Sequence, residues 1–188
     1  MPVFNRKELL QDLEATVRRG IDLVTALRAS GDARLSAPGA EDSWSVVQHL
    51  YHLNFYATFY TAALERCLDG TKSSAKETFH SGWLGNYFTN IIGPAEEEQP
   101  LKVKMKSPAN AVPPHSSELE VDAEIEAFLA FQNRMLYLLQ RARQVDLGAY
   151  RVPTSLSKWV SLKLGDSFRF VIAHQERHFQ HMERNNIA

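Results

Sequence analysis

The stretch FRFVIAHQERHFQHMER, residues 168–184, carries most of what the sequence says about fold and chemistry. It belongs to a segment with helical periodicity that runs from about Asp166 to Asn185. Its histidines, His174, His178 and His181, share one stripe of that helix because residues three and four apart lie on the same face. The apolar run FRFVIA before them indicates that this stripe faces a core. The sequence therefore predicts a helix whose buried face changes from apolar side chains to imidazoles.

Three other segments repeat apolar residues at three- and four-residue steps, the pattern of a helix with one buried face. They run from about Phe4 to Ala29, from Ser43 to Leu68 and from about Val121 to Val145. Ser43 is the expected N-cap of the second helix, and Asp166 that of the last one. Four long helices predict an all-α fold, a four-helix bundle.

The connection between the second and third helices is about fifty residues long, too long for a structureless loop in a compact domain. Residues Gly82–Ile92 predict a short amphipathic helix that ends at Gly93-Pro94. In LKVKMKSP, residues 101–108, apolar residues alternate with lysines, which predicts a short extended piece. The expected architecture is one domain over residues 1–188, with a long crossover between helices two and three that carries an extra helix.

The composition narrows the classes of function. The net charge is −1, from 21 basic and 22 acidic side chains spread over 188 residues, so no nucleic-acid partner is expected. One cysteine, Cys67, excludes an intrachain disulfide and favours a reducing compartment. No signal peptide or membrane-spanning apolar run is found. We expect a cytoplasmic protein without a membrane partner.

The histidines have two interpretations. His174 and His178 have the i, i+4 spacing by which two imidazoles of one helix bind a zinc ion. Buried imidazoles destabilise a core unless they are paired or ligated. Alternatively, the last turns of the helix emerge into solvent, where histidines interact favourably with the negative end of the helix dipole.

A second source of imidazoles favours the metal site. The segment WSVVQHLYHL, residues 44–53, places His49 and His52 three residues apart on the second helix. One of them, with the pair on the last helix, would give three neutral nitrogen ligands and leave coordination positions for water or substrate. Spacing does not distinguish His49 from His52, and either could be a buried structural histidine.

Together, WSVVQHLYHL and AHQERHFQHMER, residues 173–184, resemble the DinB-like superfamily of metal-binding four-helix bundles, which includes the bacillithiol and mycothiol S-transferases. In that family a Trp-Ser pair opens the second helix, and the histidine eight residues after the Trp is a metal ligand. Counting from Trp44 gives His52. An HxxxH pair on the last helix supplies the other two ligands, which matches His174 and His178. The family often has Gln where His181 stands, so the resemblance makes His181 a flanking residue.

The resemblance implies one divalent transition metal per chain, and imidazole ligands suit zinc or nickel. It also implies a homodimer and a thiol S-transferase, in which the metal activates a low-molecular-weight thiol for attack on an electrophile. A metal-dependent hydrolase is the alternative enzyme, although the sequence lacks a general base comparable to the Glu of HExxH. A non-catalytic stress protein that binds a metal or a small ligand is the third interpretation.

Further side chains are predicted around the metal. Asn54, Tyr56 and Phe59 follow His52 on the second helix and are expected to line the substrate site. Trp83 of the short crossover helix is expected either to cover the pocket or to pack on the bundle. Glu176 and Arg177 alternate with the histidines and predict a solvated salt bridge on the outer face.

Overall fold

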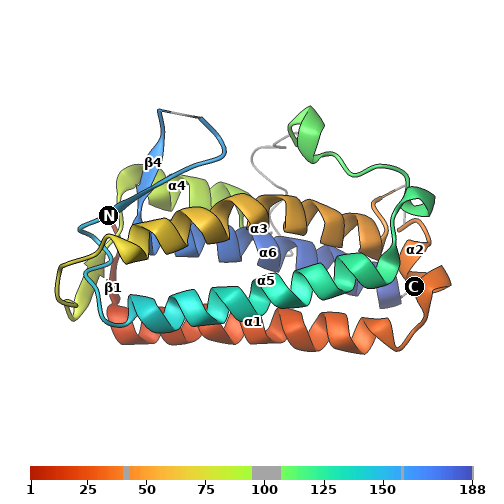
Figure 1. Cartoon of the computed structure of the whole chain (residues 1–188), viewed down its shortest axis with the longest axis horizontal. Coiled ribbons are helices and arrows are strands. Elements are labelled where there is room, and N and C mark those ends of the chain that lie inside the picture. The colour runs from red at the N-terminus through yellow and green to blue at the C-terminus, as the bar shows by residue number, and fades with distance from the viewer. Residues whose placement is uncertain (40–42, 95–106, 158, 188) are drawn as a thin grey trace.

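Four long helices form the bundle in the computed structural model, which describes residues 1–39, 43–94, 107–157 and 159–187. They are α1 (Arg6–Arg28), α3 (Val46–Asp69), α5 (Val121–Ala142) and α6 (Leu164–Ile187). Helices α1 and α6 run in one direction, and α3 and α5 in the opposite one (Figure 1). Since α3 and α5 are parallel, the chain must cross the length of the bundle between them. The predicted all-α four-helix bundle is confirmed.

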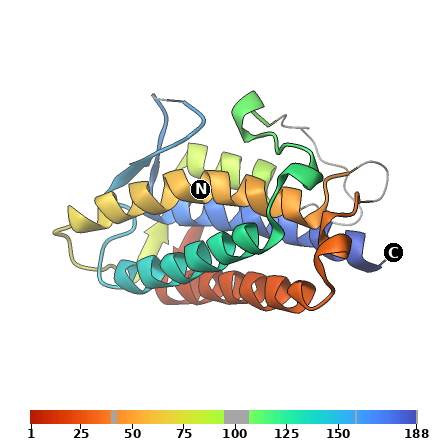
Figure 2. The ribbon, with the colours of Figure 1, turned by 45° about the vertical axis from the view of Figure 1, so that its right-hand side comes forward.

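The crossover contains the predicted extra helix. This helix, α4 (Trp83–Ile92), packs along α6 (Figure 2). Two 3₁₀ turns, η2 (Ala109–Ala111) and η3 (Ser116–Glu118), then lead into α5, and a short helix α2 (Asp32–Ser36) joins α1 to α3. The extended piece predicted at 101–108 lies outside the described residues except for its last two. No helix in the described part of the chain has both the length and the apolar character of a membrane span.

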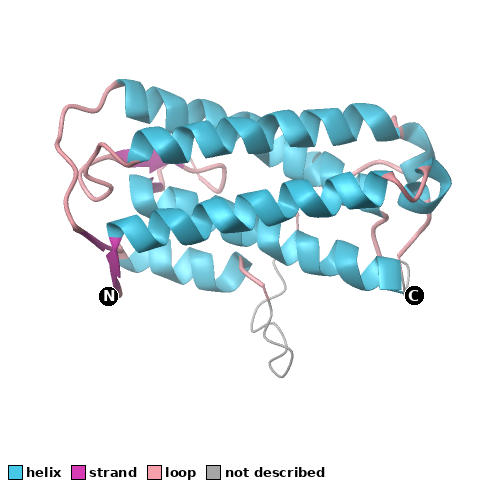
Figure 3. Cartoon of the chain, turned by 90° about the horizontal axis from the view of Figure 1, so that it is seen from below, coloured by secondary structure: helices cyan, strands magenta, loops and turns pink. Residues whose placement is uncertain are grey.

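Two small antiparallel pairs of strands were not expected from the sequence. Strand β1 (Val3–Asn5) pairs with β2 (Thr78–His80), and β3 (Arg151–Pro153) pairs with β4 (Ser161–Lys163). All four lie toward the end of the bundle opposite the C-terminus (Figure 3). Each strand has three residues, so an alternating pattern is too short to be recognised in the sequence.

The opposite end of the bundle has an apolar core that fixes α3 against α6. Leu50 and Leu53 of α3 belong to the same buried cluster as Phe179 and Met182 of α6. Gly20 of α1 allows α6 to come close, because a Cβ atom there would lie 2.3 Å from Cζ of Phe179. These residues alternate with the histidines along both helices, so the packing that orders the core also sets the positions of the imidazoles.

Helix α3 begins two residues later than predicted. Its N-cap is Ser45, whose Oγ accepts a hydrogen bond from the backbone N–H of Gln48, while Oε1 of Gln48 accepts one from the N–H of Ser45. Ser43 was the wrong choice because only Ser45 has a glutamine three residues later to complete this capping box. Gln48 also donates to the carbonyl oxygen of Pro114 at 2.7 Å, which ties the crossover to the start of α3.

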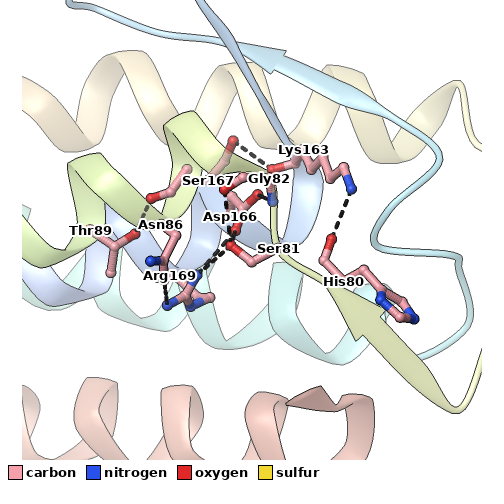
Figure 4. A network of polar contacts seen from close by, with 10 residues as sticks. His80, Ser81, Gly82, Asn86, Thr89, Lys163, Asp166, Ser167 and Arg169 are labelled. Atoms are coloured by element: carbon pink, nitrogen blue, oxygen red, sulfur yellow. Dashed lines mark hydrogen bonds and ion pairs between the residues drawn. The ribbon is translucent and has the colours of Figure 1, made fainter. Parts of the chain in front are cut away.

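Asp166 was predicted to be the N-cap of α6, and this prediction is wrong. The helix starts at Leu164, so Asp166 lies in its first turn. Its buried carboxylate accepts hydrogen bonds from Oγ of Ser81 at 2.6 Å and from the N–H of Gly82 at 2.7 Å, and it pairs with Arg169 (Figure 4). The carboxylate thus satisfies the start of α4 rather than that of its own helix. This network fixes α4 on α6, and with it the last residue of α4, Ile92, which reaches the site described next.

Candidate metal centre

Three histidines from two antiparallel helices meet between α3 and α6. Nε2 of His174 lies 3.3 Å from Nε2 of His52 and 3.1 Å from Nε2 of His178. One ring nitrogen from each of the three lies within 4.8 Å of the others, as the ligands of a single ion would. The structure thus brings together the three residues that the sequence proposed as ligands.

The ring nitrogens of His52 and His178 that point away from the cluster, their Nδ1 atoms, each have a hydrogen-bond partner. Nδ1 of His52 lies 2.7 Å from the carbonyl oxygen of Ala111 in η2. A carbonyl only accepts, so Nδ1 of His52 carries the proton and Nε2 keeps its lone pair toward the cluster. Nδ1 of His178 lies 2.8 Å from Nδ1 of His49. Three imidazole nitrogens are a suitable set of ligands for a transition-metal ion. In two of the three rings the second nitrogen is hydrogen-bonded, as is usual for histidines that bind a metal.

The environment keeps these imidazoles neutral. Burial lowers the pKa of His49 and of His174 to about 3, and neighbouring imidazoles add to the effect. Burial also lowers the pKa of His178 well below its ordinary value and lowers that of His52. Neutral imidazole is the form that binds a metal, so the site needs no deprotonation step near pH 7.

The metal-free protein is expected to lose stability as the pH falls below about 6.5. The unfolded chain binds protons at the ordinary histidine pKa, whereas folded His49 and His174 stay neutral until the pH approaches 3. Between these values each histidine should lower the free energy of unfolding by about 1 kcal/mol per pH unit. Urea denaturation of chelator-treated protein at several pH values between 7 and 5 measures this slope. His49→Leu should make the dependence of the free energy of unfolding on pH less steep. An unchanged slope would contradict the lowered pKa of His49.

The histidine cluster lies in a cavity of about 530 Å³. Tyr56 packs edge-on against both His52 and His174, with ring centroids 5.0 and 5.3 Å apart. The ring of Trp44 stacks on that of His178 at 6.1 Å. The rest of the described lining is mostly apolar and includes Leu53, Ala57, Tyr60, Ile92, Leu156, Phe170 and Val171. No aspartate or glutamate is among the described lining residues.

Of the predicted substrate residues, only Tyr56 lines this cavity. The amide of Asn54 instead donates to the backbone oxygen and the carboxylate of Glu124 on α5, because two residues after His52 the helix has turned to its opposite side. Phe59 lies at the edge of the cavity-facing stripe and is 36% exposed, outside the described lining. Trp83 is 63% exposed and stacks on Tyr87 along the outer side of α4. We therefore do not retain these three as ligand contacts.

Several lining residues were missed by the sequence reasoning. Tyr60 could have been found, since it continues the i, i+4 series of His52 and Tyr56 on α3. Ser155 and Leu156, from the loop between β3 and β4, reach the cavity only through tertiary folding, and no local pattern marks them.

The solvated salt bridge predicted for Glu176 and Arg177 is found at Glu176, whereas Arg177 faces the cavity. Glu176 pairs with Arg19 of α1 at 3.2 Å. Arg177 lines the cavity, where burial lowers the pKa of its guanidinium. Adjacent residues on a helix point about 100° apart, so the two side chains reach different neighbours.

Comparison with known proteins identifies the family. The model of the DinB superfamily matches residues 5–182, nearly the whole chain. Neither a curated protein nor a solved structure matches the chain. The DinB superfamily is a metal-binding family of helical bundles, in keeping with the three-histidine cluster between α3 and α6. On this match, the chain belongs to the DinB superfamily.

Proposed function

We propose that the protein is a metal-dependent thiol S-transferase whose ion is held by His52, His174 and His178. The observation that carries the proposal is the convergence of three neutral imidazoles in a cavity with a mostly apolar wall. One ion per chain is expected, zinc or nickel, because imidazole suits both. We further propose that residues 1–188 form a single cytoplasmic domain, as the length and the single cysteine favour. The family resemblance supports a homodimer.

A divalent metal bound by three imidazoles acts as a Lewis acid and lowers the pKa of a thiol or water brought to it. The side chains that line the cavity would surround the substrate. Tyr56, Tyr60 and Phe170 offer aromatic surface to the organic body of an electrophile and keep water from it. In the reaction the thiol would give up its proton to solvent, its sulfur would form a bond to the electrophilic carbon, and the leaving group would depart with the electrons of the bond that breaks.

Arg177 supports an anionic thiol as substrate. Its guanidinium lines the same cavity and forms no hydrogen bond or ion pair with the side chain of a described residue. Among the described residues this partly buried guanidinium has no counter-charge, and a ligand carboxylate would neutralise it with two parallel hydrogen bonds. Cysteine and thiols derived from it that keep a free carboxyl, such as N-acetylcysteine, carry such a group.

The lack of a carboxylate in the described lining favours transfer over hydrolysis. A hydrolase needs a base to take the proton of the attacking water, and Asp or Glu commonly serves. A thiol is far more acidic than water, so a thiol bound to the metal would lose its proton to solvent near neutral pH without a carboxylate base.

The test is the thiol dependence of turnover. Zinc-loaded protein should consume 1-chloro-2,4-dinitrobenzene when N-acetylcysteine is added and should not do so without a thiol. Arg177→Gln should lower kcat/KM for N-acetylcysteine by about tenfold or more, since a hydrogen bond to a charged group contributes about 1.5–3 kcal/mol. It should change kcat/KM for cysteamine, which has no carboxylate, much less.

Arg18→Gln, on the exposed surface of α1, is the matched control and should change neither rate. Ester hydrolysis without thiol would replace the transferase by a metal-dependent hydrolase. If loaded protein turns over neither kind of substrate, a binding role without catalysis replaces it.

A further inference from the structure

His49 is buried and contacts His178, although it is not one of the three proposed ligands. It lies on α3 one turn before His52 and is only 5% exposed. Its Nδ1 lies 2.8 Å from Nδ1 of His178, whereas its Nε2 is buried with no hydrogen-bond partner among the described residues. The residue is thus half satisfied, and its one polar contact is to a proposed ligand.

The direction of that hydrogen bond follows from the chemistry of ligation. A metal-binding nitrogen must offer a lone pair, and it is Nε2 of His178 that faces the other two imidazoles. The proton of neutral His178 then sits on Nδ1 and can only be donated to His49. A neutral imidazole has one ring nitrogen that donates and one that accepts, so His49 can accept this proton at Nδ1.

This arrangement has a cost that packing alone does not explain. If Nδ1 of His49 accepts, its own proton sits on Nε2, the atom without a partner. A buried donor left unsatisfied destabilises a protein by about 1–3 kcal/mol. The neighbours Val46, Leu50 and Leu53 are all apolar and buried, so a leucine at position 49 would avoid the cost.

The surroundings also fix the orientation of the His49 ring. The ring of His181 stacks on it at 5.7 Å with an interplanar angle of 8°, and Trp44 packs against it at 5.6 Å. These contacts keep Nδ1 turned toward His178. The result parallels His52, whose outer nitrogen is held by the Ala111 carbonyl.

We infer that His49 is a positioning residue of the metal centre: it accepts the hydrogen bond from Nδ1 of His178 and so fixes the tautomer and ring orientation in which His178 presents Nε2. The inference rests on the metal site of the proposed function but not on the transferase reaction. The ligand pattern of the family does not include His49, because it takes only one histidine, His52, from α3.

A pair of substitutions separates hydrogen bonding from packing. Oδ1 of an asparagine lies close to the position of a histidine Nδ1, so His49→Asn keeps an acceptor, whereas His49→Leu fills the space without one. His49→Leu should weaken zinc binding by about 10- to 100-fold, the usual effect of losing an outer-shell partner, and His49→Asn by less than about tenfold. Chelator competition gives both affinities. The metal-free His49→Leu protein should be at least as stable as the wild type, because the unsatisfied donor is gone.

A second readout reports the proton directly. Nitrogen-15 spectra of the zinc-loaded wild type should show the proton of His178 on Nδ1 and that of His49 on Nε2. A proton on Nδ1 of His49 would overturn the inference, and so would a His49→Leu protein that binds zinc as tightly as the wild type. If both variants lose affinity equally, the acceptor role is wrong. If the wild type itself binds no zinc, the metal centre fails and the inference fails with it.

Discussion

Replacing His52, His174 or His178 by alanine is expected to weaken zinc binding by more than about 100-fold, beyond the range of outer-shell substitutions. Each variant removes one of three nitrogen donors whose ligand atoms lie within 4.8 Å of one another. No aspartate, glutamate or cysteine is among the described residues that line the cavity, and its two other histidines, His49 and His181, lie outside the group of three whose ligand atoms converge. Competition with a chelator of known affinity measures the loss for each variant.

Two other histidines serve as controls. His181→Ala should weaken binding far less, because the cluster of possible ligands does not include His181. His80→Ala should have no effect, since His80 is exposed at the end of β2 and does not line the cavity. If His181→Ala abolishes binding while His52→Ala does not, the ligand assignment is wrong.

Removing the metal is expected to lower the melting temperature without unfolding the helices. A ligand that binds only the native state stabilises it by about 4 kcal/mol when present at about 1,000 times its dissociation constant. For a chain of this size, about 2–4 °C accompanies each kcal/mol, so chelation should lower Tm by about 8–16 °C. Thermal unfolding followed by circular dichroism, with and without chelator, measures the difference.

The helices should survive because the core does not depend on the ion. Two clusters of buried apolar side chains extend through the bundle, and Leu64 and Leu68 are buried on α3 twelve or more residues beyond His52. A protein with this much apolar core differs from a zinc finger, which needs its metal to fold. Loss of most of the helical signal on chelation at neutral pH would show that the metal is structural and would weigh against an enzyme.

Periodicity was sufficient to predict the bundle and the position of the site. The i, i+4 pair on α6 and the i, i+3 pair on α3 needed only the geometry of a helix to be recognised. Choosing His52 over His49 needed the family resemblance, because residues three apart on a helix differ by only about 60° around its axis. In the structure His49 and His52 both face the cluster, so periodicity rightly could not separate them.

Long-range contacts account for most of what the sequence did not reveal. The carbonyl of Ala111 behind His52 and the Ser81 partner of Asp166 are 59 and 85 residues away in the chain. Which side of α3 faces the cavity was the other unknown. The stripe of α3 that faces the cavity contains His52, Tyr56 and Tyr60. Each step of four residues turns this stripe by about 40° around the helix axis, so Phe59 lies at its edge.

Metal content is the measurement that tests the central claim most directly. Wild-type protein purified without added metal, then equilibrated with zinc and freed of excess, should carry about one zinc ion per chain by elemental analysis. The His52→Ala and His178→Ala proteins, treated in the same way, should carry almost none. Wild-type protein that retains less than about a tenth of an equivalent after equilibration would contradict the claim that these three histidines form a metal centre.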